Sequence, residues 1–113
     1  MHELSIVMSI IDIAHQHAEK EQATSIDEID LDIGNLSTVE PDAFEFAWKQ
    51  GVKNTLLSNA IKNINWIKGM ALCSDCNNSF EIKNLYDECP HCKGHLLQII
   101  SGKELRVRSL IVS

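Results

Sequence analysis

Two Cys-x2-Cys pairs constrain the fold of this chain more than any other feature of its sequence. Cys73 and Cys76 form the first pair, and Cys89 and Cys92 form the second after twelve intervening residues. Two residues between cysteines let both thiolates turn onto one ion, so two such pairs complete a tetrahedral shell. Because a closed shell leaves no position for water or a substrate, we predict a structural zinc ion that folds a segment with little core of its own.

The remaining sequence predicts an α+β fold. The predicted elements, in chain order, are a helix over residues 3–20, a strand over 26–33, a helix that starts near Pro41 and ends near Gly51 to Asn54, a strand over 61–67 and a last strand over 104–112. We therefore expect two helices on a small three-stranded sheet, with a zinc-ribbon-like module inserted before the last strand. The expected domain boundaries place residues 1–69 and 101–113 in the α+β domain and residues 70–100 in the four-cysteine module.

Side-chain patterns inside these elements carry further expectations. The apolar face of the first helix is wider than contact with one sheet requires. Burial inside the domain is the simpler explanation, and contact with a protein partner is the alternative. The acidic residues of the first strand are predicted to form a solvated face that protects a sheet edge, and they are Asp27, Glu28, Asp30 and Asp32. In the last strand, Leu105, Val107 and Ile111 are expected to share one face.

Composition and absent motifs narrow the function. The chain has 16 acidic and 10 basic residues and a net charge of −6, which disfavours binding to nucleic acid and to anionic membrane surfaces. No apolar run approaches the length of a membrane span, and the N-terminus lacks the pattern of a secretory signal, so we expect a cytoplasmic protein. The sequence has no phosphate-binding loop and no serine-nucleophile motif, and all its cysteines are assigned to metal, so we expect no enzymatic activity.

The N-terminus is the second candidate metal site. The α-amino group of Met1, the next backbone nitrogen and the imidazole of His2 can chelate one ion, and such planar nitrogen donors suit Ni(II) or Cu(II). The spacing alone is weak evidence, because any chain that begins Met-His meets it. The remaining histidines are predicted to be ordinary helix or loop residues, a metal contact being the alternative for the last two; they are His15, His17, His91 and His95.

Four segments, taken in order, resemble the HypA/HybF family of nickel metallochaperones, which act in the maturation of nickel–iron hydrogenase. They are Met1-His2-Glu3-Leu4-Ser5; Leu31-Asp32-Ile33-Gly34-Asn35-Leu36-Ser37 followed by Val39-Glu40-Pro41; the two cysteine pairs with Pro90 in the second; and Ser101-Gly102-Lys103-Glu104-Leu105-Arg106-Val107-Arg108-Ser109. The resemblance covers essentially the whole chain. The combination is specific, although paired cysteine knuckles alone occur in many zinc ribbons.

This resemblance implies a transient nickel site at the N-terminus, beside the structural zinc. It implies that His2 is the nickel ligand, with the terminal amine of Met1 and nearby backbone nitrogens completing the site; for Glu3 the backbone nitrogen is the expected donor. The family works with a HypB-type GTPase and delivers nickel to the hydrogenase large subunit, and some relatives also serve urease maturation. The first helix resembles the surface that the family uses for its GTPase.

The sequence also departs from the family pattern. Lys93 stands between the last cysteine and Gly94, and Leu72 precedes the first cysteine where the family often has an aromatic residue. No histidine directly follows Cys76 or Cys92, which argues against an exchange of cysteine for histidine in the zinc shell. The alternatives to a nickel carrier are a zinc-ribbon adaptor without a nickel role and a rubredoxin-like iron electron carrier.

Overall fold

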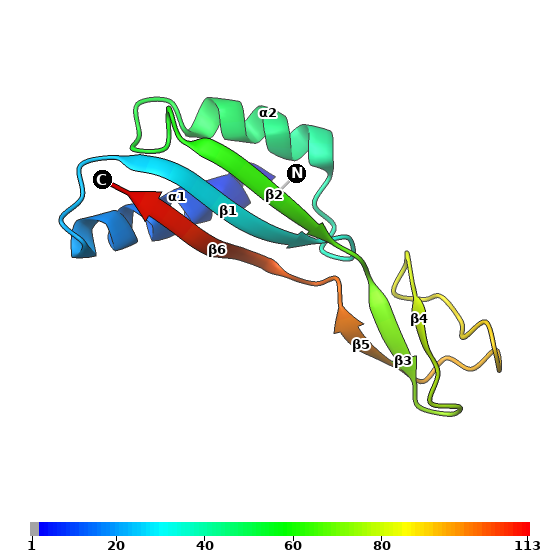
Figure 1. Cartoon of the computed structure of the whole chain (residues 1–113). Coiled ribbons are helices and arrows are strands. Elements are labelled where there is room, and N and C mark those ends of the chain that lie inside the picture. Colours follow the sequence, from blue (N-terminus) through cyan, green and yellow to red (C-terminus); the bar gives the residue numbers. More distant parts are fainter. Residues whose placement is uncertain (1–2) are drawn as a thin grey trace. The chain divides into compact units, whose positions relative to one another are not determined.

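A computed structural model describes residues 3–113, and within that range it confirms the predicted α+β fold (Figure 1). The elements, in chain order, are α1 (Glu3–Lys20), β1 (Ile26–Gly34), α2 (Pro41–Gly51), β2 (Ile61–Ile67), β3 (Met70–Cys73), β4 (Ser79–Glu81), β5 (Leu97–Ser101) and β6 (Leu105–Val112). Both predicted helices and the three predicted strands are present. The short strands β3, β4 and β5 were not predicted, because three to five residues are too few for an alternating pattern to stand out.

The chain forms two compact units. The first unit comprises the chain up to Asp32, together with residues 39–65 and 106–113. The second unit comprises residues 33–38 and 66–105, so it contains all four cysteines. Each unit therefore has its own sheet and its own buried side chains.

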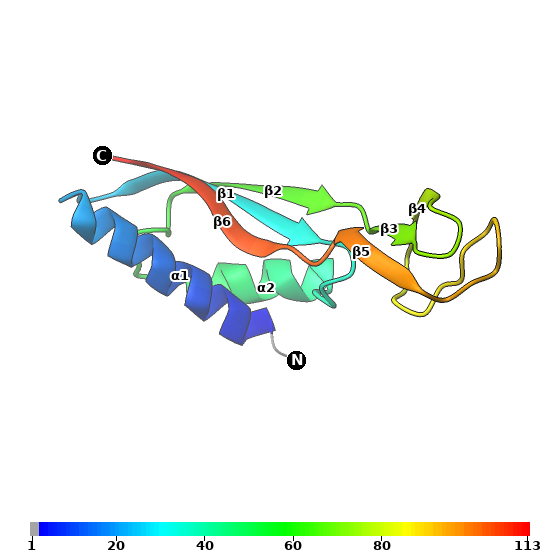
Figure 2. The same ribbon diagram turned by 90° about the horizontal axis from the view of Figure 1, so that it is seen from below.

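The first unit is a three-stranded sheet with two helices on one face. Its strand order is β2-β1-β6, and Figure 2 shows α1 and α2 on the same side of these strands. Alternate apolar side chains of β1 point towards the helices, as the sequence pattern predicted. The largest buried apolar side chains of this unit come from both helices, from β1 and from the loop after α2, and include Val7, Ile11, Ile29, Leu31, Phe44 and Leu57.

The prediction that the acidic residues of β1 protect a sheet edge is wrong, and the prediction that they form a solvated face is wrong for Asp32. β1 is the central strand of its sheet, so it has no free edge to protect. Asp32 is only 3% exposed, and its carboxylate accepts hydrogen bonds from Arg106 Nε at 2.9 Å and from Asn65 Nδ2 at 3.2 Å. The partners lie on β6 and β2, far away in the sequence, which explains why a local pattern could not reveal them.

The last strand changes phase along its length. Ser109 donates a hydrogen bond to Asp30 at 3.0 Å, and Arg106 donates to Asp32, so both side chains lie on the outer face of the sheet. Residues three apart in a regular strand would lie on opposite faces, so the alternation must shift between them. Ile111 lies two residues after Ser109, so its side chain is also on the outer face, where it is exposed. The prediction that Ile111 shares a face with Val107 was therefore wrong.

The second unit has a separate antiparallel sheet with strand order β4-β3-β5. Its core is small: Leu36, Ala71 and Ile82 are buried, and three partly buried side chains pack against them, namely Phe80, Leu97 and Ile99. The 33–38 segment joins this unit through close backbone contact. A Cβ atom at Gly34 would lie 1.9 Å from the carbonyl oxygen of Gly102, whose own φ is +110°. Both positions therefore require glycine.

Candidate metal centres

The four cysteines converge on one point in the second unit. Cys73 ends β3 and Cys76 follows it, while Cys89 and Cys92 lie between β4 and β5. Their Sγ atoms all lie within 4.8 Å of one another, with 3.5 Å between Cys73 and Cys92 and 3.6 Å between Cys76 and Cys89. A disulfide has an S–S distance of about 2.05 Å. A tetrahedral ion with sulfur bonds of about 2.3 Å separates its ligands by about 3.8 Å, so the cluster has the size of a metal-binding site.

The two cysteine loops share one backbone conformation. In each loop the carbonyl oxygen of the first cysteine accepts a hydrogen bond at 2.8 Å from the N–H four residues later, donated by Asn77 to Cys73 and by Lys93 to Cys89. The N–H of the first cysteine donates in turn to the carbonyl five residues later, at 2.9 Å in both loops. Asn77 and Lys93 have φ values of 61° and 64°, so each loop closes through a left-handed residue. Asparagine adopts this conformation more readily than lysine.

The thiol groups of the cluster have unequal acidity. Hydrogen bonds from the side-chain amide and the backbone N–H of Asn78 lower the pKa of Cys76 to about 6. The backbone N–H of Gly94 lowers the pKa of Cys92, but the Cys73 thiol, burial and the other two cysteine thiols together outweigh it, so the pKa rises to about 12. Four thiolates at this distance repel one another, so a doubly charged cation among them is needed to keep all four deprotonated.

Two histidines lie beside the cluster without joining it. The imidazole of His91 is exposed, and its backbone N–H donates to Cys89 Sγ at 3.4 Å. His95 is also exposed, and its Nε2 lies 3.9 Å from a carboxylate oxygen of Glu88. Within residues 3–113, the only group of three or more potential metal ligands is the set of four cysteines. Neither imidazole belongs to the four-cysteine group.

The predicted nickel ligands Met1 and His2 lie outside the described residues, whereas Glu3 lies within them. Glu3 opens α1, and its buried carboxylate accepts a hydrogen bond from the Glu40 N–H at 3.4 Å. The carboxylate of Glu40 caps α2 by accepting from the N–H groups of Asp42 at 3.2 Å and Ala43 at 2.6 Å. The start of α1 is therefore bonded to the start of α2. No local sequence pattern reveals this contact, because its partners are 37 positions apart.

Apolar side chains surround this contact on the outside of the two helices. Leu4, Met8 and Phe46 are all exposed, and Phe46 is 68% exposed. A cavity of about 250 Å³ lies between the helices, lined by Glu3, Leu4, Ala43, Phe46, Ala47 and Gln50. Part of the wide apolar face of α1 is therefore not used inside the unit.

With this geometry in place, comparison with known proteins identifies the family. The family described as "Hydrogenase/urease nickel incorporation, metallochaperone, hypA" matches residues 1–112. The chain belongs to the HypA family. This result confirms the resemblance inferred from the four sequence segments.

Similar HypA proteins cover nearly the whole chain. The hydrogenase maturation factor HypA of Parabacteroides distasonis is 40% identical over 112 residues, spanning 99% of this chain and 97% of that protein. The corresponding factor of Pelodictyon phaeoclathratiforme is 36% identical, with 99% and 96% covered. Among solved structures, the solution structure of the Ni metallochaperone HypA from Helicobacter pylori matches with a TM-score of 0.69 at 32% identity, covering 99% of this chain and 97% of that one. The HypA fold therefore extends over both units.

The helices of the described range are too short or too polar to cross a membrane.

Proposed function

We propose that this chain carries Ni(II) at its N-terminus and releases it during maturation of nickel–iron hydrogenase. The supporting observation is the family match, which names nickel incorporation and covers the opening Met1-His2-Glu3. The terminal amine of Met1, the following backbone nitrogens and the imidazole of His2 offer the planar nitrogen donors that Ni(II) prefers. Glu3 contributes its backbone nitrogen, because its carboxylate is engaged with the Glu40 N–H.

In this proposal the four-cysteine site holds a structural zinc ion. Four sulfur donors at tetrahedral spacing suit zinc, and the closed shell leaves no position for a substrate. The small core of the second unit supports this role, because binding a metal to an otherwise marginal fold contributes directly to its folding free energy. The two metals then have different tasks, one held permanently and one carried.

The partners we propose are a HypB-type GTPase and the hydrogenase large subunit, with urease maturation proteins as additional partners. GTP hydrolysis belongs to the GTPase, which agrees with the absence of a phosphate-binding loop from this sequence. The exposed apolar side chains of α1 and α2 beside Glu3 provide a surface for it. The chain itself performs no catalysis, and it works in the cytoplasm, where its thiols remain reduced.

In this proposal, nickel binding at the N-terminal amine and the His2 imidazole depends on pH. Both the amine and the imidazole must lose their protons to bind, and their ordinary pKa values are about 7.7–8.0 and about 6.5. Nickel affinity should therefore fall as the pH decreases from 8 to 6. Zinc bound by four thiolates should be retained over most of this range.

The test is a nickel titration of the untagged, zinc-loaded chain beside three variants. His2→Ala and a form with a short N-terminal extension should lose the absorption band of planar Ni(II), while His95→Ala should retain it. Retention of normal affinity by His2→Ala would show that nickel binds elsewhere. Metal analysis of the purified chain should return one zinc, whereas iron and a red colour would support the electron-carrier alternative.

A further inference from the structure

The two edges of the first unit's sheet differ in how they are protected. On the β2 edge, Lys62 points inward, where its Nζ lies 2.6 Å from Glu45 Oε1 and 5.9 Å from the centre of the Trp48 ring. An inward-pointing charge is one of the devices that prevent a further strand from adding to a sheet. On the β6 edge the inward side chains, namely Val107, Leu110 and Val112, are all apolar, and β6 contains no lysine or proline. The β6 edge therefore lacks the protection that β2 has.

The backbone of β6 offers hydrogen-bonding groups at this edge. Ser113, directly after β6, forms backbone hydrogen bonds with the two residues that precede β1. Its carbonyl accepts from the Thr24 N–H at 2.8 Å, and its N–H donates to the Ser25 carbonyl at 3.0 Å. Successive residues of a strand turn their backbone groups to opposite neighbours, so Leu110 and Val112 turn theirs to the edge away from β1. In the described part of the chain, β6 pairs with β1 alone.

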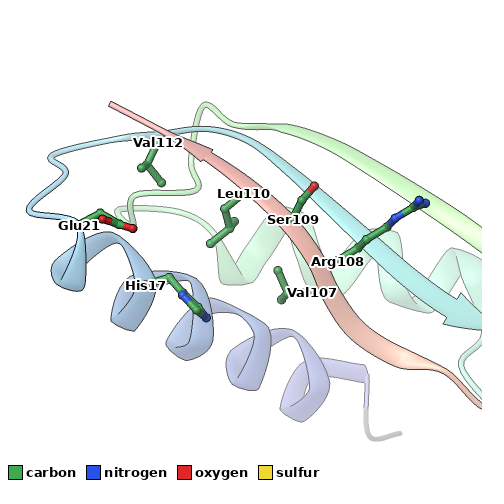
Figure 3. Close-up of a pocket in the computed structure, with 7 residues that line it drawn as sticks. All are labelled: His17, Glu21, Val107, Arg108, Ser109, Leu110 and Val112. Carbon is green, nitrogen blue, oxygen red and sulfur yellow. The ribbon is translucent and has the colours of Figure 1, made fainter.

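A cavity of about 460 Å³ runs along the same edge, between β6 and the end of α1 (Figure 3). Val107, Leu110 and Val112 face α1 across it and are only half-buried, while His17 and Glu21 contribute its polar side. Ile13 lies one helical turn before His17, so it is on the same flank of α1, and it is exposed. Helix and strand thus leave an apolar strip that a fourth strand beside β6 would cover.

The charge of β6 indicates the chemistry of such a strand. Leu105–Val112 contains two arginines and no acidic residue, although the chain has a net charge of −6. Its existing neighbour β1 alternates apolar and acidic residues, and Asp32 of β1 is paired with Arg106. Arg108 is exposed and forms no ion pair with any residue in the 3–113 range, being attracted only at longer range by Asp30. An acidic side chain on a strand added at the open edge would complement Arg108.

We propose that the open edge of β6 binds an extended segment of a partner protein, with alternate apolar residues facing α1 and acidic residues on the outer face. Backbone hydrogen bonds to β6 supply affinity, and the cavity and Arg108 supply selectivity. A second copy of this chain fits less well, because β6 against β6 brings together arginines of like charge. This inference does not depend on nickel binding.

The probe is a synthetic peptide with the sequence of Ile26–Gly34, which has the required alternation of apolar and acidic residues. It is titrated into the full, zinc-loaded and 15N-labelled chain. The backbone N–H groups of Leu110 and Val112 should shift and exchange more slowly, while those of β2 should not change. A control peptide with every acidic residue replaced by lysine should not bind. The proposal is overturned if millimolar acidic peptide leaves the N–H signals of Leu110 and Val112 unchanged, or if it shifts instead the signals of residues that line the cavity between α1 and α2.

Charge-reversal variants make the test specific. Arg108→Glu should weaken peptide binding by about tenfold, because an attraction across the strands becomes a repulsion. Lys49→Glu makes the same change on an exposed position of α2 and should leave affinity unchanged within about twofold. Arg108→Gln should have an intermediate effect. Equal effects of the Arg108 and Lys49 variants on peptide affinity would contradict the proposal. It would also be contradicted if the Leu110 and Val112 amides were protected without peptide and lost that protection on dilution. That result would identify a second copy of the chain as the occupant of the β6 edge.

Discussion

The two units of this chain are stabilised by different means. The first unit buries apolar side chains from two helices and a central strand, including Phe44, Ile29 and Leu31. The second unit buries Leu36, Ala71 and Ile82 and places four thiol groups within 4.8 Å of one another. Small modules bury too little apolar surface to be stable by packing alone, and a metal commonly supplies the missing free energy. The comparison indicates that metal removal and core mutation should act on different halves of the molecule.

The units also differ in what joins their segments. In the first unit, side-chain hydrogen bonds add to the backbone bonds between distant segments, as Arg106 does with Asp32 and Glu3 with the Glu40 N–H. In the second unit, backbone meets backbone, since Leu36 donates its N–H to the Gly102 carbonyl at 2.7 Å. A contact of this kind tolerates no side chain at Gly34. A substitution of Asp32 or Glu3 should therefore remove side-chain hydrogen bonds from the first unit, whereas any side chain at Gly34 should disrupt the backbone contact of the second unit.

The largest expected effect is the loss of metal from the second unit. Cys73→Ser removes one of four ligands, and structural zinc in small modules contributes about 10–16 kcal/mol. We expect the amides of β3, β4 and β5 to lose their protection from hydrogen exchange, while those of α1 and β1 retain it. Ser74→Ala, at an exposed position in the same loop, should keep both the metal and the protection. Full protection of β3 in metal-free Cys73→Ser would show that packing alone stabilises this unit.

A smaller effect is expected from the core of the first unit. Phe44→Ala removes a fully buried aromatic side chain and should lower the free energy of unfolding by about 3–5 kcal/mol. Phe46→Ala makes the same change two positions later on α2, where the ring is mostly exposed, and should cost less than about 0.5 kcal/mol. Denaturant unfolding measures both values. Metal content should stay the same in both variants, and loss of metal from Phe44→Ala would show that the two units are not independent.

The smallest effect concerns the left-handed residue of the second cysteine loop. Lys93 has a φ of 64°, as Asn77 does at 61° in the first loop. Lys93→Asn should stabilise the second unit by about 1 kcal/mol, because asparagine tolerates this conformation better than lysine. Thermal unfolding of the zinc-loaded chain measures the gain. Lys103→Asn supplies the comparison at an exposed position without a positive φ, and an equal gain there would rule out the backbone explanation.

Patterns that repeat over short distances were predicted correctly from the sequence. The helix over residues 3–20 was found because its apolar period extends over eighteen residues, and the cysteine cluster was found because two residues between cysteines suit a single ion. Short elements were missed, since β4 has only three residues. The phase of β6 was also missed, because residues 110–112 are all apolar and are therefore compatible with either phase of the strand.

The sequence by itself determined the type of each long element, the spacing of the four cysteines and the family to which the chain belongs. Local periodicity and ligand spacing are properties of neighbouring residues, so they can be seen without a fold. Only the tertiary structure decided that Asp32 is buried against Arg106, 74 positions away, and that β6 lies at an open edge. These features depend on which strands become neighbours, and strand order follows from the packing of the whole unit rather than from any one segment.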